Sequence, residues 1–494
     1  MKFTAIAAAC LSLLSSTSAT DSVVAPASSK VILPSTFKPP QVFKNANLVH
    51  IVSLEKNYAK ESINVVIENS SSEPQDEYFL PFTSEQMEKV GGIEVKDRKN
   101  PEVVGFTVDA VEFDPSRQAG DTQFYRIKLP SPLPPKGQQT IGISFYYLKA
   151  LKPLPASIEQ ADKQYLVYAF SAYCPSAYPT LKQKTEVKLP SSDVPDYTKI
   201  AGSGETKEFP VKQGAKLTYG PFPEVPAGAS SPVKVRYEFT KPVTHVSELE
   251  RDIEVSHWGG NVAFEERYTL FHYGANLSNQ FNRVKWAQSQ YFNPQSYALK
   301  EMKFLLGAGS KDAYFTDVIG NVSTSRFRST KREAVLELKP RYPIFGGWKY
   351  PFTVGWNADS SNYLKKSGGS FLLNVPLIEG PKQAEGVEYE HVNVRVILPE
   401  GAENIKFYTT APESLITEHS VELVKTYLDT IGRTVLTIKA RNLVDELRDR
   451  ELIVSYDYST MAALRKPFVI FTSTMTVFVG MWLLSKLDVK FSTK

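Results

Sequence analysis

The histidines and paired acidic residues are the side chains of this sequence best suited to chemistry. Adjacent acids occur at Glu265 and Glu266 and again in the segment 444–451. Successive side chains of a strand point to opposite faces, so neighbours of this kind do not form a catalytic carboxylate pair. None of the histidines belongs to an HExxH pattern, which holds zinc between two histidines one helical turn apart. The six histidines are His50, His245, His257, His272, His391 and His419.

Two histidines flank an expected hairpin. His257 lies in the segment 252–258, Gly259 and Gly260 form the turn, and His272 lies in the segment 262–273. We expect the two rings to face each other across this hairpin. Histidines on strands are more often satisfied by backbone groups or water than by a metal, so no metal site is predicted.

Nucleophile and nucleotide motifs are missing as well. The sequence contains no GxSxG elbow, no phosphate-binding P-loop and no GxGxxG after a strand. It also lacks the Asp-x-Asp that holds the metal of many nucleotide-sugar transferases. The sequence therefore predicts a protein with no catalytic residue, no metal and no cofactor.

Three Asn-x-Ser sequons are the remaining chemical signal. They begin at Asn69, Asn276 and Asn321, and none has Pro in the middle position. Each is predicted to carry an N-linked glycan if the chain enters the secretory pathway.

Both ends of the chain predict that entry. Residues 1–19 combine Lys2, an apolar run and small residues, which is typical of a cleaved signal peptide. Residues 467–485 carry no charge and, as a helix, reach roughly 28 Å, enough to cross a bilayer. We therefore expect a type I membrane protein with the bulk of the chain in the lumen.

The apolar segment also has a face of small residues. Thr472, Thr476 and Gly480 recur at four-residue spacing, which lets another helix approach closely. We predict that this face serves assembly with other membrane helices. In the alternative, the hydroxyl groups bond only to carbonyls of their own helix.

Between the ends, the apolar pattern alternates with a period of two. Segments such as 63–69, 124–129 and 140–148 are rich in β-branched and aromatic residues, and prolines separate them. This pattern predicts a mainly β protein: two tandem lumenal antiparallel β-sandwich domains followed by one transmembrane helix. The predicted order is a signal peptide at 1–19, an extended leader at 20–45, β domains at 46–241 and 242–464, the transmembrane helix with its flanks at 465–486, and a cytosolic tail at 487–494. The same order of a strand, a turn and a second strand precedes both Asn69 and Asn276. This repetition is a weak indication that the two predicted domains are related.

The charge balance and the cysteines limit the kinds of partner that the sequence predicts. Lys and Arg number 57 against 53 Asp and Glu, and both signs are mixed along the chain, so no nucleic acid is expected. Cys10 leaves with the signal, and Cys174 is then a lone thiol that we expect to be buried.

Several long segments, in the same order, are similar to the ribophorin I family in its fungal form. The first domain matches more loosely, through the segment 47–69. The segments of the second half are SHWGGNVAFEE at 256–266, DVIGNVSTS at 317–325, PRYPIFGGWKYPFTVGWN at 340–357, VILPEGA at 396–402, TYLDTIGRTVL at 426–436 and KLDVKFSTK at the end.

The resemblance implies an accessory subunit of the oligosaccharyltransferase in the endoplasmic reticulum membrane. That complex N-glycosylates nascent chains at Asn-x-Ser/Thr, and its active site lies in a separate multi-spanning subunit. The implied partners are this catalytic subunit, small membrane subunits of the complex, membrane lipid and the nascent polypeptide. The implied roles are complex assembly and presentation of the acceptor.

Two other function classes remain open from the residues. A lumenal peptidase or glycosidase would need a metal or carboxylate frame, which the sequence lacks. A lumenal chaperone or cargo receptor would bind unfolded chains or glycans through surface aromatics.

Overall fold

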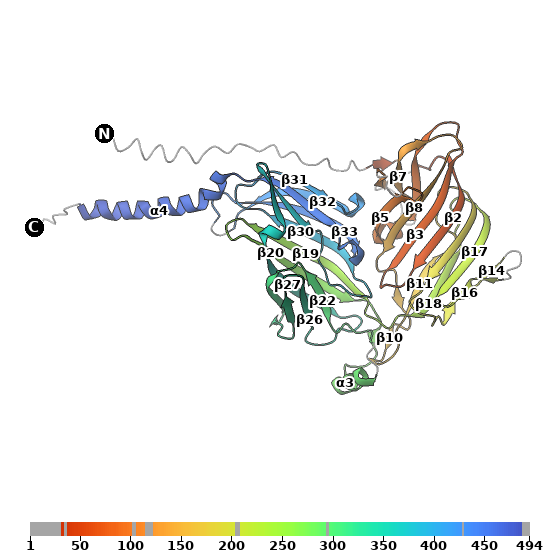
Figure 1. Ribbon diagram of the computed structural model, residues 1–494. Coiled ribbons are helices and arrows are strands. Elements are labelled where there is room, and N and C mark those ends of the chain that lie inside the picture. The colour runs from red at the N-terminus through yellow and green to blue at the C-terminus, as the bar shows by residue number, and fades with distance from the viewer. Residues whose placement is uncertain are drawn as a thin grey trace, which may run out of the picture.

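The computed structural model describes residues 31–33, 37–100, 105–113, 122–202, 208–292, 296–426 and 429–486. The predicted signal peptide and cytosolic tail lie outside these residues. Strands dominate the described chain, and one long helix extends from its C-terminal side (Figure 1). The prediction of a mainly β fold followed by one apolar helix is confirmed.

The first unit contains strands β1 to β18. A seven-stranded sheet in the order β16-β17-β12-β2-β3-β8-β5 is accompanied by two four-stranded sheets, β1-β6-β7-β4 and β13-β18-β11-β9. The elements are β1 (Val31–Leu33), β2 (Phe43–Ser53), β3 (Ala59–Asn69), β4 (Gln75–Thr83), α2 (Ser84–Lys89), β5 (Val90–Asp97), β6 (Thr107–Phe113), β7 (Thr122–Leu133), β8 (Gln138–Tyr147), β9 (Lys152–Pro153), β10 (Ser157–Ile158), β11 (Tyr165–Ser171), β12 (Thr180–Lys188), β13 (Asp196–Tyr197), β14 (Ile200–Ala201), β15 (Glu208–Phe209), β16 (Val211–Gln213), β17 (Lys216–Val225) and β18 (Pro232–Glu238).

The second unit contains strands β19 to β34. Its eight-stranded sheet has the order β24-β23-β27-β20-β19-β30-β33-β32, and two smaller sheets, β22-β26-β25 and β28-β29-β34-β31, accompany it. The elements are β19 (Thr244–Ser256), β20 (Asn261–His272), β21 (Asn276–Leu277), α3 (Arg283–Phe292), β22 (Met302–Leu306), β23 (Lys311–Asp317), β24 (Gly320–Asn321), β25 (Arg326–Ser329), β26 (Ala334–Leu338), β27 (Lys349–Asp359), η2 (Ser360–Asn362), β28 (Leu364–Ser367), β29 (Ser370–Pro376), β30 (Glu388–Ile397), β31 (Glu403–Thr409), η3 (Glu413–Leu415), β32 (Ile416–Val424), β33 (Arg433–Val444), η4 (Asp445–Leu447) and β34 (Glu451–Asp457).

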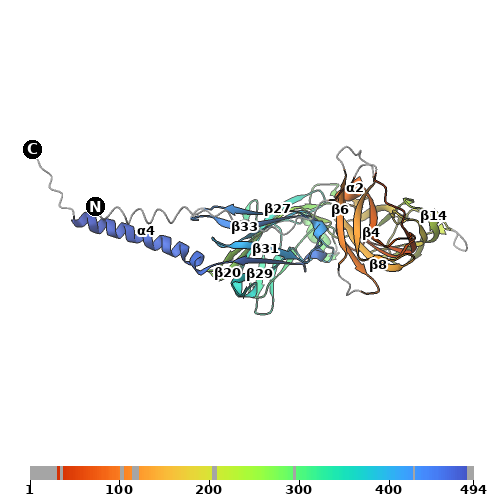
Figure 2. The ribbon, with the colours of Figure 1, turned by 90° about the horizontal axis from the view of Figure 1, so that it is seen from above.

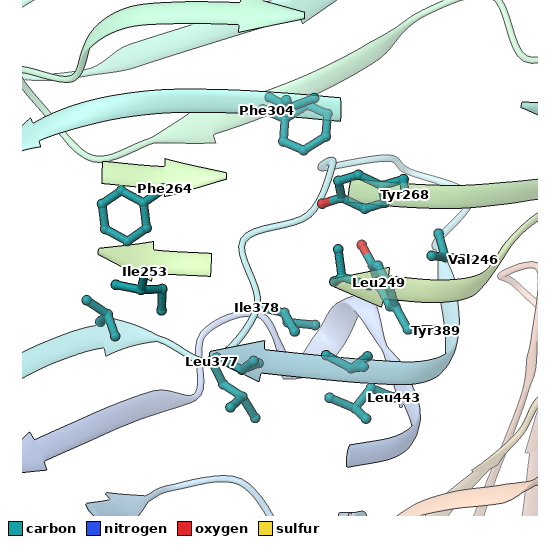
Figure 3. Close-up of a cluster of buried hydrophobic side chains, with 14 of the residues drawn as sticks. Val246, Leu249, Ile253, Phe264, Tyr268, Phe304, Leu377, Ile378, Tyr389 and Leu443 are labelled. Carbon is teal, nitrogen blue, oxygen red and sulfur yellow. The ribbon is translucent and has the colours of Figure 1, made fainter. Parts of the chain in front are cut away.

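Alternating side chains build the core of each unit. Every second residue of β3 is buried, including Ile63, Val65 and Ile67, and β20 alternates in the same way. Burial of one such side chain stabilises the fold by about 1.5–3 kcal/mol. Figure 3 shows the core of the second unit, where Leu249 and Ile253 of β19 lie near Tyr389 of β30 and Phe264 of β20. The period of two in the sequence therefore corresponds to one buried face per strand.

The two units repeat one topology. Read in order, β17-β12-β2-β3-β8-β5 of the first unit corresponds to β33-β30-β19-β20-β27-β23 of the second, with β16 and β32 at matching edges. The smaller sheets correspond too: β6-β7-β4 matches β25-β26-β22, and β13-β18-β11-β9 matches β31-β34-β29-β28. Corresponding strands follow the same order along the chain. The register even shifts at a similar place in both leading hairpins, between Asn45 and Asn47 and between Val246 and Glu248.

The sheets that we predicted to be antiparallel also contain parallel pairs. β2 pairs parallel with β12, and β19 pairs parallel with β30. Each parallel pair joins strands separated by most of a unit, and the intervening chain forms other strands of the same sheet and strands of the smaller sheets. Alternation of apolar residues determines which face is buried but not which strand lies alongside, so the sequence pattern could not predict this.

The two units lie side by side (Figure 1), and charged and polar side chains join them. Asp445 accepts hydrogen bonds from the Tyr58 hydroxyl at 2.8 Å and from Lys56 at 2.9 Å. Glu446 accepts from Lys60 at 2.6 Å and from the Tyr146 hydroxyl at 2.8 Å. The acids of segment 444–451 that were considered for catalysis therefore connect the two units.

Close backbone approach strengthens the same junction. The Asn442 amide donates to the carbonyls of Glu88 and Val90 at 2.8 and 2.9 Å. A Cβ at Gly91 would lie 1.9 Å from the Asn442 carbonyl oxygen, so only glycine fits there. Residues Tyr58 and Tyr146 belong to the buried cluster of the second unit, which makes the junction continuous with its core.

Helix α4 (Thr460–Lys486) follows β34 directly and points away from the β units (Figure 2). It begins at Thr460 rather than at 465, so its first turns lie against the second unit. Likewise, β1 and the start of β2 lie inside the segment predicted as an extended leader.

Candidate glycosylation sites and the base of the membrane helix

Three of the six histidines are buried, and all three bond to protein groups. His50 Nε2 lies 2.8 Å from Glu61, and His245 contacts Glu388 at 2.8 Å and Glu390 at 3.1 Å. His272 donates to the Tyr297 carbonyl at 2.6 Å, and burial lowers its pKa to about 4. Within the described ranges no group of three His, Cys, Asp or Glu is placed to hold a metal ion.

The expected contact between His257 and His272 is wrong. Register pairs Thr244 with His272 at one end of the β19–β20 hairpin and Ser256 with Asn261 at the other. His257 belongs to the turn, where it lies 2.8 Å from the Tyr456 hydroxyl. Two residues that flank a hairpin in sequence are opposite each other only when both are equally far from the turn.

The acids at Glu265 and Glu266 point to opposite faces, as predicted. Glu266 is buried, pairs with Arg251 and accepts from the Tyr268 hydroxyl at 2.5 Å. Glu265 lies on the other face and accepts from the Tyr314 hydroxyl at 2.6 Å. Solvent does not reach the Glu266 carboxylate, so the Arg251–Glu266 pair is structural.

Cys174 is buried and free, as predicted. Burial raises the pKa of its thiol well above the ordinary value. A protonated thiol without access to solvent is a poor nucleophile.

The acceptor residues of the three sequons differ in burial and hydrogen bonding. Asn69 ends β3 with its side chain buried, and its amide nitrogen donates to the carbonyls of Glu73 and Leu133, each at 2.8 Å. Its side-chain oxygen accepts from the Ser71 backbone N–H at 2.8 Å. A glycan would replace one N–H of this amide and would have to occupy the space beside it. The folded structure therefore argues against the sequon at Asn69.

The other two acceptor residues are exposed. Asn276 lies in the short strand β21, which pairs parallel with β10 of the first unit. Asn321 ends β24, which follows the turn 318–319, and Val318 and Ile319 of that turn are 80 % and 77 % exposed. Both amide groups can carry a glycan without disturbing the core.

The hydroxyl groups of α4 bond within the helix. Thr472 donates to the Phe468 carbonyl at 2.9 Å, and Thr476 donates to the Thr472 carbonyl at 2.8 Å. Beyond the backbone of its own helix turn, no described atom lies within 4 Å of a Cβ built at Gly480. The face of Thr472, Thr476 and Gly480 is thus open, with its hydroxyls already satisfied.

The base of α4 holds residues that the sequence analysis missed. Pro467 lacks an N–H, so the carbonyl of Ala463, four residues earlier, loses its helical partner. The indole N–H of Trp258, in the β19–β20 turn, donates to that carbonyl at 2.8 Å. Lys466 adds ion pairs to Asp429 at 2.8 Å and to Glu400 at 3.3 Å. A proline near the start of an apolar helix was the one available signal, because it predicts a carbonyl that needs an outside donor.

Fold and site together define the class of protein. Two mainly β units precede one helix that is long and apolar enough to cross a membrane, as expected of a single-span membrane protein with a large β domain on one side.

The chain belongs to the Ribophorin I family, whose model matches residues 43–485. It is 30% identical over 452 residues to dolichyl-diphosphooligosaccharide–protein glycosyltransferase subunit 1 of Caenorhabditis elegans, covering 91% of this chain and 73% of that one. It is also 30% identical over 424 residues to the protein of the same name from Schizosaccharomyces pombe, covering 85% and 90%.

A faint likeness to solved structures was also found. An M1 zinc metallopeptidase from Deinococcus radiodurans aligns with 12% sequence identity and a TM-score of 0.26, covering 43% of this chain and 42% of the other. A likeness at this level says nothing of a shared fold or activity.

Proposed function

We propose that this chain is a non-catalytic subunit of the oligosaccharyltransferase complex, which N-glycosylates proteins at Asn-x-Ser/Thr. The observation that carries the proposal is the extent of the similarity. The family match runs from β2 through both units into α4. The relatives that share it are named as subunit 1 of that glycosyltransferase.

The way the polar groups are used supports an accessory role. Arg251, Glu266 and His272 are buried and bonded within one unit, whereas Asp445 and Glu446 hold the two units together. The active site of the complex would then lie in a separate multi-spanning subunit. This chain would contribute to assembly and present the acceptor polypeptide.

The proposed topology is type I in the endoplasmic reticulum membrane. The two units, at 46–241 and 242–464, are the lumenal domains, α4 crosses the bilayer, and 487–494 is the cytosolic tail. Asn276 and Asn321 are the proposed glycan acceptors, because their side chains are exposed. The face of Thr472, Thr476 and Gly480 is proposed to meet helices of the catalytic and small membrane subunits.

Purification in a mild detergent tests the proposal. The tagged chain is expected to arrive with a stable complex that contains the catalytic subunit, and its depletion is expected to reduce glycosylation of a reporter. A lumenal chaperone or cargo receptor would arrive largely alone or with client chains. Recovery of the chain alone, with normal reporter glycosylation after depletion, would overturn the proposal.

A further inference from the structure

A cavity lies where the second unit meets α4. Its volume is about 410 Å³, and its walls come from the β19–β20 hairpin, the turn after β30, the start of β33 and the first turns of α4. Two of its lining residues, Pro467 and Ile470, belong to the charge-free stretch of the helix. If α4 crosses the bilayer as proposed above, a cavity shared by the β unit and the first apolar turn lies at the depth of the lipid headgroups.

The charges around this cavity leave an excess of carboxylates. Arg433 pairs with Glu254 and lies 3.5 Å from Asp429, while Lys466 pairs with Asp429 and Glu400. Glu254 and Glu400 line the cavity together with these two cations, and a third carboxylate, Asp429, lies behind the wall within ion-pair distance of both cations. The local field favours a ligand with a positive group.

Glu400 is built to stay ionised in the wall of the cavity. Its side chain is buried, and its Oε1 accepts backbone N–H groups of Thr430 at 2.8 Å and Ile431 at 2.5 Å. Burial alone would raise the pKa of this carboxyl, but hydrogen bonds from the Thr430 hydroxyl and from the backbone N–H groups of Ile431 and Gly432 hold it below the ordinary value. Its Oε2 has no hydrogen bond, only the ion-pair contact with Lys466.

Aromatic rings line the same space. Trp258 and Tyr458 both contribute to the wall, and the Trp258 side chain is 66 % exposed. The ring of His257 packs against Tyr458 with centroids 4.7 Å apart, which holds the tyrosine ring in place. Aromatic faces beside carboxylates are the surroundings in which proteins bind quaternary and primary ammonium groups.

We propose that this cavity binds the headgroup of a zwitterionic phospholipid. The ammonium group lies against the aromatic rings and Glu254, the phosphate lies beside Lys466, and the acyl chains follow α4 past Ile470. The excess of carboxylates disfavours an anionic headgroup. The bound lipid fills the space between the β unit and the bilayer surface and so adds to the contacts that set the direction of α4.

Photocrosslinking in nanodiscs tests the proposal. The whole complex, purified through this chain, is placed in phosphatidylcholine nanodiscs that contain a phosphatidylcholine probe with a diazirine in its headgroup. Label is expected on peptides that contain Trp258 or residues 458–470. Ala462→Phe, which fills the cavity, and Glu254→Gln are each expected to reduce that label at least fivefold.

Matched control variants distinguish loss of lipid from the cavity from a general effect of substitution on the protein. Leu464→Phe adds the same ring to an exposed position outside the cavity wall, and Glu265→Gln removes a carboxylate that pairs with Arg267 elsewhere on the sheet. Both should label like the unmodified chain. Equal labelling of the Ala462→Phe variant, or stronger labelling by a phosphatidylserine probe, would overturn the proposal. Normal recovery of the complex in all variants keeps this outcome distinct from a failure of the proposed function.

Discussion

Buried ion pairs determine how single substitutions act in the second unit. Arg251 is fully buried between Glu266 and Glu379, and its guanidinium lies over the ring of Phe264 at 5.2 Å. Glu379 is the weaker partner, because burial raises its pKa to about 7 despite the nearby Arg251 charge. Most of the compensation for the buried cation therefore comes from Glu266.

Replacing Glu266 with Ala leaves the buried Arg251 largely uncompensated. We expect the substitution to destabilise the chain by about 3–5 kcal/mol. Thermal unfolding of the full-length chain in detergent, followed by tryptophan fluorescence, measures the loss. Its neighbour provides the control: Glu265→Ala removes a half-exposed carboxylate and should cost less than about 1 kcal/mol. Equal effects of the two substitutions would contradict the assignment of Glu266 as the main partner of the buried Arg251.

The sequons also differ at the residue level. Asn321→Gln and Asn276→Gln are each expected to increase gel mobility by one glycan, because both amides are exposed. Asn69→Gln should leave mobility unchanged, since the Asn69 amide nitrogen donates two hydrogen bonds inside the fold and is expected to carry no glycan. Treatment with endoglycosidase gives the reference band. A shift in the Asn69 variant would mean that the folded state can accommodate a glycan at this position.

At the level of elements, α4 combines an anchor with an open face. Replacing Thr472, Thr476 and Gly480 together by Leu keeps the helix apolar and long enough to insert. We expect this variant to reach the membrane, to co-purify poorly with the other subunits and to underglycosylate a reporter, because Leu side chains prevent close helix approach.

A second triple variant controls for the effect of three substitutions to Leu elsewhere in the same helix. Phe471, Phe478 and Trp482 changed to Leu leave the small face intact and should retain normal assembly. Normal recovery of the complex in both variants would show that the β units alone specify assembly, with the hydroxyls serving only their own helix.

The strands could be predicted from sequence, and the contacts between distant segments could not. The hairpin 252–273 was readable because alternating residues flank Gly259 and Gly260, and β19 and β20 confirm it. The parallel pairing of β2 with β12 and the burial of Asn69 depend on which distant strands become neighbours. The donor for Ala463 also comes from Trp258, more than two hundred residues earlier in the chain.

For the whole molecule, the proposed topology gives a direct test. Protease added to sealed microsomes should remove a tag placed after Lys494 and leave the two β units intact, because the proposed topology leaves only the tail in the cytosol. Detergent should make the whole chain accessible and serves as the control. Protection of the tag in sealed vesicles would exclude the type I arrangement.

The repeated topology has a consequence for synthesis of the chain on the ribosome. The main sheets of each unit close within one continuous stretch, and among the strands that the structure describes only the short β10–β21 pair crosses between the units. At roughly 5 to 20 residues per second, the last strand of the first unit is complete about 10 to 45 s before α4 is made. The first unit can therefore acquire its core while the second is still being translated. The second unit then folds against a surface that is already formed and that includes its contact residues Gly91, Tyr58 and Tyr146.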